Sequence, residues 1–315
     1  MSNLTADPNA WRDWPIARLE REYSPSSCVP SLDPFLAAYT RGSAEALANL
    51  SSRRNLPWGD GADEVFDFFP AASPDSPLLI FFHGGYWQEH SKDDVLFVAS
   101  KCVPCGIAYA SVNYTLAPRA TVSTIVDQCR RAVISISRQA PELEFNRRRL
   151  FVAGSSAGAH LASMLLVEGW QREQRTSENL IAGAILLSGV YDLQPLVSTY
   201  INQALKMTAS DAIALSPIKL RLAAPVPVVV AWGENEPDEF KRQSQAFANV
   251  LRESAFPVKT LEACGANHFD IVSEIADTET ALGRLTLDLI AGNEPARRAT
   301  NRSLGKILPR KNAHP

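Results

Sequence analysis

The sequence predicts an α/β fold in which helices flank a mostly parallel central sheet, preceded by an N-terminal helical cap. From about residue 65, short apolar runs alternate with longer amphipathic segments, as in parallel strands joined by crossover helices. The 315 residues suffice for one large domain with appendages. A content of 46% hydrophobic and 21% charged residues is typical of globular proteins, which excludes fibrous and wholly disordered classes.

Three regions follow from this patterning. Residues 1–60 have apolar residues at helical spacing and are expected to form a cap or lid. Residues 61–293 are expected to form the core, with strands at 78–82, 107–113, 150–153, 181–187, 226–232 and 258–262, and with helices at 121–138, 158–170, 239–254 and 275–290. Residues 294–315 are expected to be a flexible tail, basic from residue 297 onward.

Charge and composition indicate the class of partner. The net charge of −3 gives no broad basic surface for nucleic acid or an anionic membrane, so we expect a small-molecule partner. The cysteines number five, an odd count that favours reduced thiols over a disulfide framework. The first residues lack the pattern of a secretory signal, so a cytoplasmic location is expected. A homodimer is compatible with the sequence.

Residues 154–158 form a G-x-S-x-G motif centred on Ser156. An apolar strand is predicted before it and a helix after it, which is the context that a nucleophilic serine on a sharp turn requires. Gly154 and Gly158 leave room for the backbones to approach. The N-terminal amides of the helix favour developing negative charge. A plain small-residue turn is the structural alternative, and Ser155 is a rival nucleophile.

A second glycine motif, His83-Gly84-Gly85-Tyr86-Trp87, follows the strand predicted at 78–82. Hydrolases with a G-x-S-x-G turn take oxyanion-binding amides from a loop at this position. We therefore expect the amides near Gly84 and Gly85, with that of Ala157, to stabilise a tetrahedral intermediate. His83 is expected to brace the loop.

Chain order points to the base and limits the acid. The fold runs nucleophile, acid and then histidine, and His268 is the one of the five histidines that lies between the last predicted strand and the last predicted helix. The acid should follow the strand at 226–232, and its usual spacing favours Glu236, with Asp238 and then Glu234 as alternatives. These groups would carry out acyl transfer without a metal or organic cofactor.

The two glycine motifs resemble those of a known family. H-G-G-x-W at 83–87 and G-x-S-A-G-A-H at 154–160 are similar to motifs of the kynurenine formamidase (arylformamidase) group, within the hormone-sensitive-lipase-like α/β-hydrolases. The resemblance extends over about residues 18–290. It implies an α/β-hydrolase fold with Ser156, Glu236 and His268 as catalytic residues. Many members have Asp at the position of Glu236, so the choice of acid stays open.

The resemblance also implies hydrolysis of the N-formyl group of formylkynurenine, or of related aryl amides and esters. A broad-specificity carboxylesterase is the alternative, and a non-catalytic ligand-binding protein is a third reading. Six aromatic residues beside the motif loops are expected to line a substrate pocket, with ordinary core packing as the alternative. They are Tyr86, Trp87, Tyr191, Trp232, Phe240 and Phe269.

Overall fold

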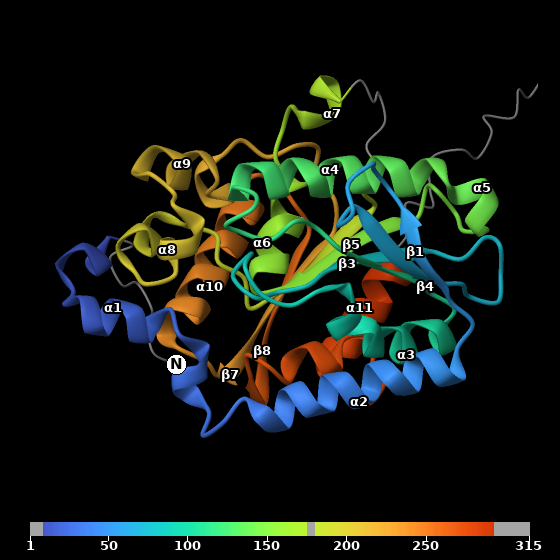
Figure 1. Cartoon of the computed structure of the whole chain (residues 1–315), viewed down its shortest axis with the longest axis horizontal. Coiled ribbons are helices and arrows are strands. Elements are labelled where there is room, and N and C mark those ends of the chain that lie inside the picture. The colour runs from blue at the N-terminus through green and yellow to red at the C-terminus, as the bar shows by residue number, and fades with distance from the viewer. Residues whose placement is uncertain (1–8, 175–179, 293–315) are drawn as a thin grey trace, which may run out of the picture.

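A computed structural model describes residues 9–174 and 180–292. Its centre is an eight-stranded sheet in the order β1-β2-β4-β3-β5-β6-β7-β8, in which β3 to β8 run parallel and β1 and β2 pair antiparallel (Figure 1). The strands are β1 Arg53–Pro57, β2 Val65–Phe69, β3 Leu78–Phe82, β4 Ala108–Val112, β5 Leu150–Ser155, β6 Gly183–Leu187, β7 Val228–Asn235 and β8 Val258–Asn267. The predicted α/β fold is therefore confirmed.

Helices cover both faces of the sheet, because successive strand residues point to opposite sides. Helices α4 (Val122–Arg138), α6 (Ala157–Met164) and α10 (Asp238–Glu253) pack on the face of Ile80 and Val152. Helices α2 (Asp33–Asn49), α3 (Ala99–Cys102) and α11 (Ala281–Ala291) pack on the face of Phe81 and Ala153. The shorter helices are α1 Ile16–Glu22, α5 Ala140–Leu143, α7 Trp170–Glu173, α8 Asn202–Leu205 and α9 Ala209–Ala214.

Two predicted helices are shorter than expected. The helix after the G-x-S-x-G motif ends at Met164, since Val167 forms a bridge with Leu222 and Gly169 has a φ of 106°. The last helix starts at Ala281, because the Thr280 side chain accepts the N–H of Gly283 and caps it there.

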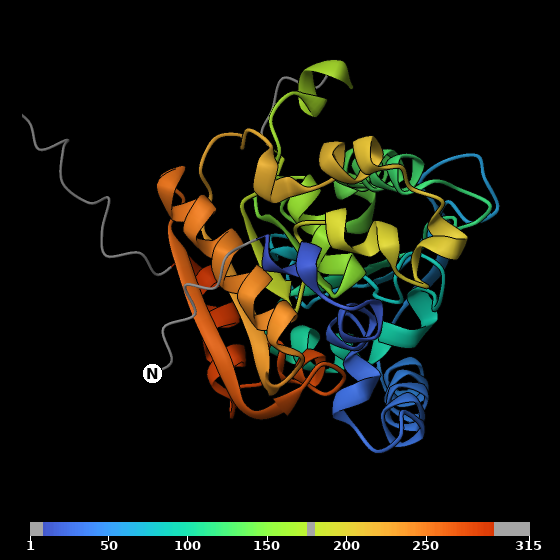
Figure 2. The ribbon, with the colours of Figure 1, turned by 90° about the vertical axis from the view of Figure 1, so that its left-hand side faces the viewer.

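The N-terminal region differs from a purely helical cap. Helices α1 and α2 fall in the range predicted as cap, but β1 lies there too and pairs with β2. Helix α1 lies beside α10, at the end of the sheet where α10 begins, as Figures 1 and 2 both show. The predicted basic tail from residue 294 lies outside the described residues.

Candidate active site

Ser156 lies on a sharp turn between β5 and α6. Its backbone has a φ of 57° and a ψ of −120°, a conformation that a non-glycine residue rarely adopts. The flanking glycines are required by contact: a Cβ at position 158 would lie 1.9 Å from the Phe82 carbonyl oxygen, and one at position 154 would lie 2.3 Å from the Gly158 carbonyl. The Ser156 N–H donates to the Leu187 carbonyl at 2.8 Å, which fixes the turn against β6.

Glu236 and His268 form a buried pair at the ends of β7 and β8. The His268 Nδ1 lies 3.0 Å from Glu236 Oε2, and their side chains are 7% and 0% exposed. The other oxygen, Oε1, accepts the Gly233 N–H at 2.6 Å and the Ser188 hydroxyl at 2.5 Å. Three donors thus surround the Glu236 carboxylate. Because Glu236 engages Nδ1 of His268, Nε2 is the ring nitrogen that is free for chemistry.

The neighbouring carboxylates have other contacts. Glu234 is exposed and accepts the Gly265 N–H at 2.7 Å, a bond that lowers the pKa of this carboxyl. Asp238 is exposed and begins α10, where a negative charge favours the helix N-terminus. Among the described residues, Glu236 is the carboxylate that contacts His268.

The loop that carries His268 is held by its neighbours in the chain. Asp270 accepts the Asn267 N–H at 2.7 Å and its side-chain amide at 2.6 Å. The Asn267 side-chain oxygen in turn accepts the Phe269 N–H at 2.8 Å. Burial raises the pKa of the Asp270 carboxyl. On the other side, the ring of Phe240 contacts the imidazole at 4.7 Å between centroids.

Ser156 and His268 line the same cavity, which has a volume of about 230 Å³. The hydrogen bonds within the described ranges do not include one between the Ser156 hydroxyl and His268. Hydrogen bonds of this kind often tighten only when substrate binds. Further lining residues are Ser24, Pro25, Ser26, Leu32, Leu36, Tyr39, His83, Gly84, Gly85, Tyr86, Glu89, His90, Asp94, Val95, Ser155, Tyr200, Phe269 and Val272.

The glycine loop at 83–87 faces Ser156. A Cβ at Gly84 would lie 3.3 Å from the Ser156 Cβ, so the loop backbone approaches the serine closely. Gly85, Tyr86 and Trp87 have φ values of 96°, 48° and 60°, an uninterrupted left-handed stretch. Gly84 and Gly85 donate no N–H to another described residue. Ala157 is the first residue of α6, where helix amides lack intrahelical partners.

His83 stabilises this loop through a hydrogen bond to its backbone. Its ring stacks on Tyr114 at 4.2 Å between centroids, and Nδ1 lies 2.9 Å from the Gly84 carbonyl. Burial lowers the pKa of the imidazole to about 4, so the ring is neutral near pH 7 and its Nδ1–H donates to that carbonyl.

Of the six aromatic residues expected in the pocket, Tyr86 and Phe269 line the cavity. The structure corrects the expectation for the other four. Trp87 packs edge-on against His160 at 5.0 Å, Tyr191 stacks on Phe247 at 4.4 Å, Phe240 contacts His268, and Trp232 lies in the core on the face covered by α10. We therefore do not propose these four as substrate contacts.

The N-terminal segment supplies one wall of the cavity, through residues that no motif indicated. Leu32, Leu36 and Tyr39 line the cavity, although nothing near them resembles a motif. Ser188, whose hydroxyl donates to Glu236, was not among the predicted site residues either. Ser188 has a φ of 50° directly after β6. Ser188 follows the carboxyl end of β6, the strand beside β7, and this position could have predicted a side chain near Glu236.

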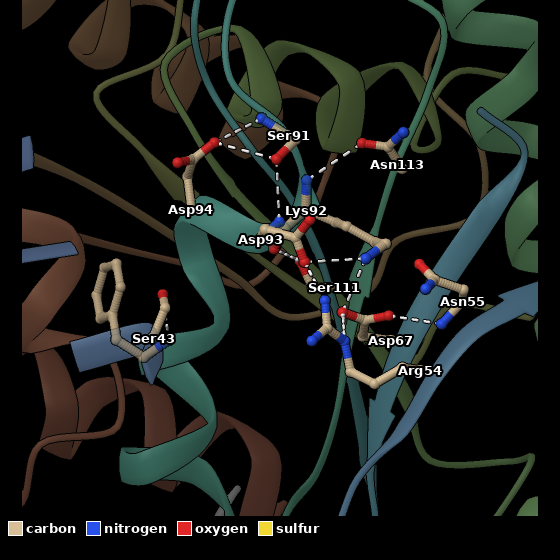
Figure 3. Close-up of polar contacts among 11 residues, drawn as sticks. Ser43, Arg54, Asn55, Asp67, Ser91, Lys92, Asp93, Asp94, Ser111 and Asn113 are labelled. Carbon is tan, nitrogen blue, oxygen red and sulfur yellow. Dashed lines mark hydrogen bonds and ion pairs between the residues drawn. The ribbon is translucent and has the colours of Figure 1, made fainter. Parts of the chain in front are cut away.

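An ion network built around the buried Lys92–Asp67 pair anchors the segment η3 (Lys92–Val98) (Figure 3). Asp94 and Val95 of this segment line the cavity. The Lys92 ammonium lies 2.9 Å from Asp67 and 3.0 Å from Asp93, although Lys92 is 4% exposed and Asp67 is fully buried. Arg54 donates to the same Asp67 oxygen at 2.6 Å. The network ties η3 to β2, which carries Asp67.

Comparison with known proteins identifies the family. The family model for the alpha/beta hydrolase fold matches residues 79–270. The kynurenine formamidase of Danio rerio is 34% identical over 293 residues, covering 89% of this chain and 98% of the relative. The chain belongs to the kynurenine formamidase family. Members of this family are α/β hydrolases, and the chain is accordingly a hydrolase.

Two more distant relatives of this kynurenine formamidase-family chain extend the comparison. The crystal structure of a candidate thioesterase from Silicibacter sp. TM1040 superposes with a TM-score of 0.74 at 26% identity, covering 87% of this chain and 98% of that one. The esterase LipQ of Mycobacterium tuberculosis is 26% identical, covering 70% of this chain and 58% of the relative. Helices long and apolar enough to cross a bilayer do not occur in the described ranges.

Proposed function

We propose that this chain hydrolyses the amide bond of an aryl formamide, such as N-formylkynurenine, through an acyl-enzyme on Ser156. The observation that carries the proposal is the buried Glu236–His268 pair, which opens onto the cavity that Ser156 and Gly84 also line. The relationship to kynurenine formamidase of Danio rerio supports the substrate class.

The first half-reaction forms the acyl-enzyme. His268 Nε2 takes the proton as the Ser156 Oγ attacks the formyl carbon, and Glu236 stabilises the imidazolium through Nδ1. The carbonyl oxygen becomes an oxyanion that accepts hydrogen bonds from the amides near Gly84, Gly85 and Ala157. The intermediate collapses when His268 returns the proton to the nitrogen, and the C–N bond breaks to release the arylamine.

The second half-reaction regenerates the serine. Water enters, His268 takes one of its protons, and the hydroxide attacks the formyl ester on Ser156. The intermediate collapses with return of the proton to Ser156 Oγ, and formate leaves. The cavity suits an aromatic leaving group, because Tyr86, Phe269 and Leu36 offer apolar surface beside Ser156.

A substrate panel tests the proposal. We expect the wild type to release formate from N-formylkynurenine, and Ser156→Ala to reduce kcat by about 10⁴-fold or more because no other group replaces the nucleophile. Formate release and the ultraviolet absorbance of the arylamine product measure the rate. Absence of formamide turnover by a protein that a fluorophosphonate labels at Ser156 would remove the substrate assignment.

A broad-specificity carboxylesterase is the second candidate, favoured by the similarity to esterase LipQ. Comparing kcat/KM for N-formylkynurenine with kcat/KM for short p-nitrophenyl esters separates the two functions. A formamidase should prefer the formamide, whereas an esterase should prefer the esters. A non-catalytic ligand-binding protein would react with neither substrate and would resist the fluorophosphonate.

We also propose a cytoplasmic enzyme that acts on a small molecule and does not bind nucleic acid. Five unpaired cysteines support a reducing compartment, and the net charge of −3 is unfavourable for a polyanion. Cell fractionation tests the location. A homodimer stays a prediction that sedimentation can check.

A further inference from the structure

Tyr23 joins three parts of the molecule that meet at the active site. It is 1% exposed, although it lies in the N-terminal segment. Its backbone carbonyl accepts the Tyr86 hydroxyl at 2.6 Å. Its own hydroxyl donates to Glu239 Oε2 at 2.7 Å and accepts from Gln243 Nε2 at 2.7 Å. One residue thus contacts the glycine loop through its backbone and α10 through its side chain.

The partners of this hydroxyl on α10 are themselves held in place. Gln243 is fully buried, and its Oε1 accepts the backbone N–H groups of Tyr191 at 2.6 Å and Asp192 at 2.7 Å. Glu239 is paired with Arg242 at 2.6 and 2.8 Å. The hydroxyl is therefore attached to a fixed helix and not to a mobile surface.

Helix α10 reaches from Tyr23 to the base. Phe240 follows Glu239 in the chain and is 1% exposed. Its ring meets the His268 imidazole edge-on, with an interplanar angle of 71°, and lies 6.2 Å from the ring of Tyr23. A shift of α10 would alter the packing around His268.

On the other side, the Tyr86 bond supports a strained backbone. Left-handed conformations such as those of Tyr86 and Trp87 persist only where surrounding contacts hold them. Tyr86 donates through its hydroxyl to Tyr23, and the Trp87 carbonyl accepts the Ala117 N–H at 2.8 Å. The Gly85 carbonyl also accepts the N–H groups of Gln88 and Glu89, both at 2.9 Å. His83 holds the Gly84 carbonyl at the other end of the same peptide, so the direction of the Gly85 amide depends on His83 together with these contacts.

We propose that Tyr23 is a positioning residue for acyl transfer, because it fixes the separation between the glycine loop and α10. The inference rests on the proposed function, since it assumes that the loop amides and His268 act on one carbonyl. The N-terminal segment then belongs to the rigid framework of the active site and does not open as a lid. Small displacements of aligned groups are costly, and about 1 Å can reduce a rate about a hundredfold.

A double-mutant cycle tests this role. Tyr23→Phe breaks the link to α10, and Tyr86→Phe breaks the link to the glycine loop. We expect each variant to lower kcat by about tenfold or more and to leave KM within about twofold. Since the two bonds act in series through Tyr23, the double variant should be no slower than the slower single variant. Rates are measured on N-formylkynurenine and, separately, on p-nitrophenyl acetate.

Ser137→Ala is the control for loss of a buried hydroxyl. Ser137 is 1% exposed and donates to the Ile134 carbonyl at 2.9 Å on α4, outside the cavity lining. Urea unfolding measures the stability of every variant. The proposal fails if Tyr23→Phe keeps kcat within about twofold, if the two effects multiply, or if Ser137→Ala loses as much kcat.

The two assay substrates separate this proposal from the proposed function. A wild type that cleaves only the ester would contradict the formamide assignment, while the ester kcat of the variants still decides the role of Tyr23. A wild type that cleaves neither substrate would overturn both proposals.

Discussion

The acid is distinguished from its neighbours by contact and burial. Glu236 is surrounded by donors from His268, Gly233 and Ser188, so its ionised form has partners at both oxygens. Chain spacing alone left Glu234 and Asp238 as alternatives, because three carboxylates within five residues cannot be separated by order. The directions of the three side chains distinguish the acid, and these directions depend on how the end of β7 packs against β8.

Glu236→Gln should therefore be far more harmful than the matched change Asp238→Asn. The amide that replaces one oxygen brings hydrogens toward a site that is built from donors, and it cannot stabilise an imidazolium. We expect kcat to fall by at least about a hundredfold for Glu236→Gln, as for the equivalent change in other triads, and by less than about tenfold for Asp238→Asn. Steady-state kinetics on one substrate provides the comparison, and the opposite ranking would move the acid to Asp238.

At the scale of elements, the motifs were predictable because they are local. A strand, a turn with glycines and a helix are contiguous in the sequence, so the arrangement around Ser156 follows from residues 150–164. Strand β1 could not be predicted in this way, since Arg53–Pro57 has a polar sequence that ends in proline. It forms because β2 offers an edge to pair with, and an edge position tolerates the proline.

The segment η3 is stabilised by charge, and Lys92→Met tests how much. Removing the ammonium leaves Asp67 fully buried with Arg54 and Asn55 as partners. Breaking a buried ion pair typically costs about 3–5 kcal/mol. The control Lys101→Met removes the Lys101–Asp277 pair, in which Lys101 is 44% exposed, and such pairs contribute about 0–1 kcal/mol. Urea unfolding should give a clearly larger loss of unfolding free energy for Lys92→Met. Equal losses would contradict the anchoring role.

At the scale of the whole molecule, contacts between distant segments were beyond sequence reasoning. Tyr86 and Trp87 are adjacent, yet one lines the cavity and the other packs on His160 in the core. A rule based on proximity to a motif cannot separate two neighbours that point to different sides. Proximity to a motif also cannot predict the role of Tyr39, which lies 117 positions before Ser156 in the chain. Tyr39 lines the cavity because α2 packs there.

The buried histidines also give the whole fold a pH dependence. Burial lowers the pKa of His83 and of His160 to about 4, from an ordinary value of 6.5. Between these values the unfolded chain binds more protons than the folded one, so the unfolding free energy rises with pH and falls on acidification. Asp270 and Glu274 act in the opposite direction, because burial raises their pKa values.

We therefore expect each buried histidine to lower the unfolding free energy by about 1 kcal/mol from pH 7 to pH 5.5. Urea unfolding at both pH values measures the change. In His160→Gln the difference between the two pH values should shrink by about 1 kcal/mol, whatever the absolute stability of the variant, because its proton uptake on unfolding is lost. Ser137→Ala, which removes a buried hydroxyl and no titratable group, serves as the control and should keep the wild-type difference between the two pH values. An unchanged difference in His160→Gln would mean that this imidazole is protonated alike in the folded and unfolded chain.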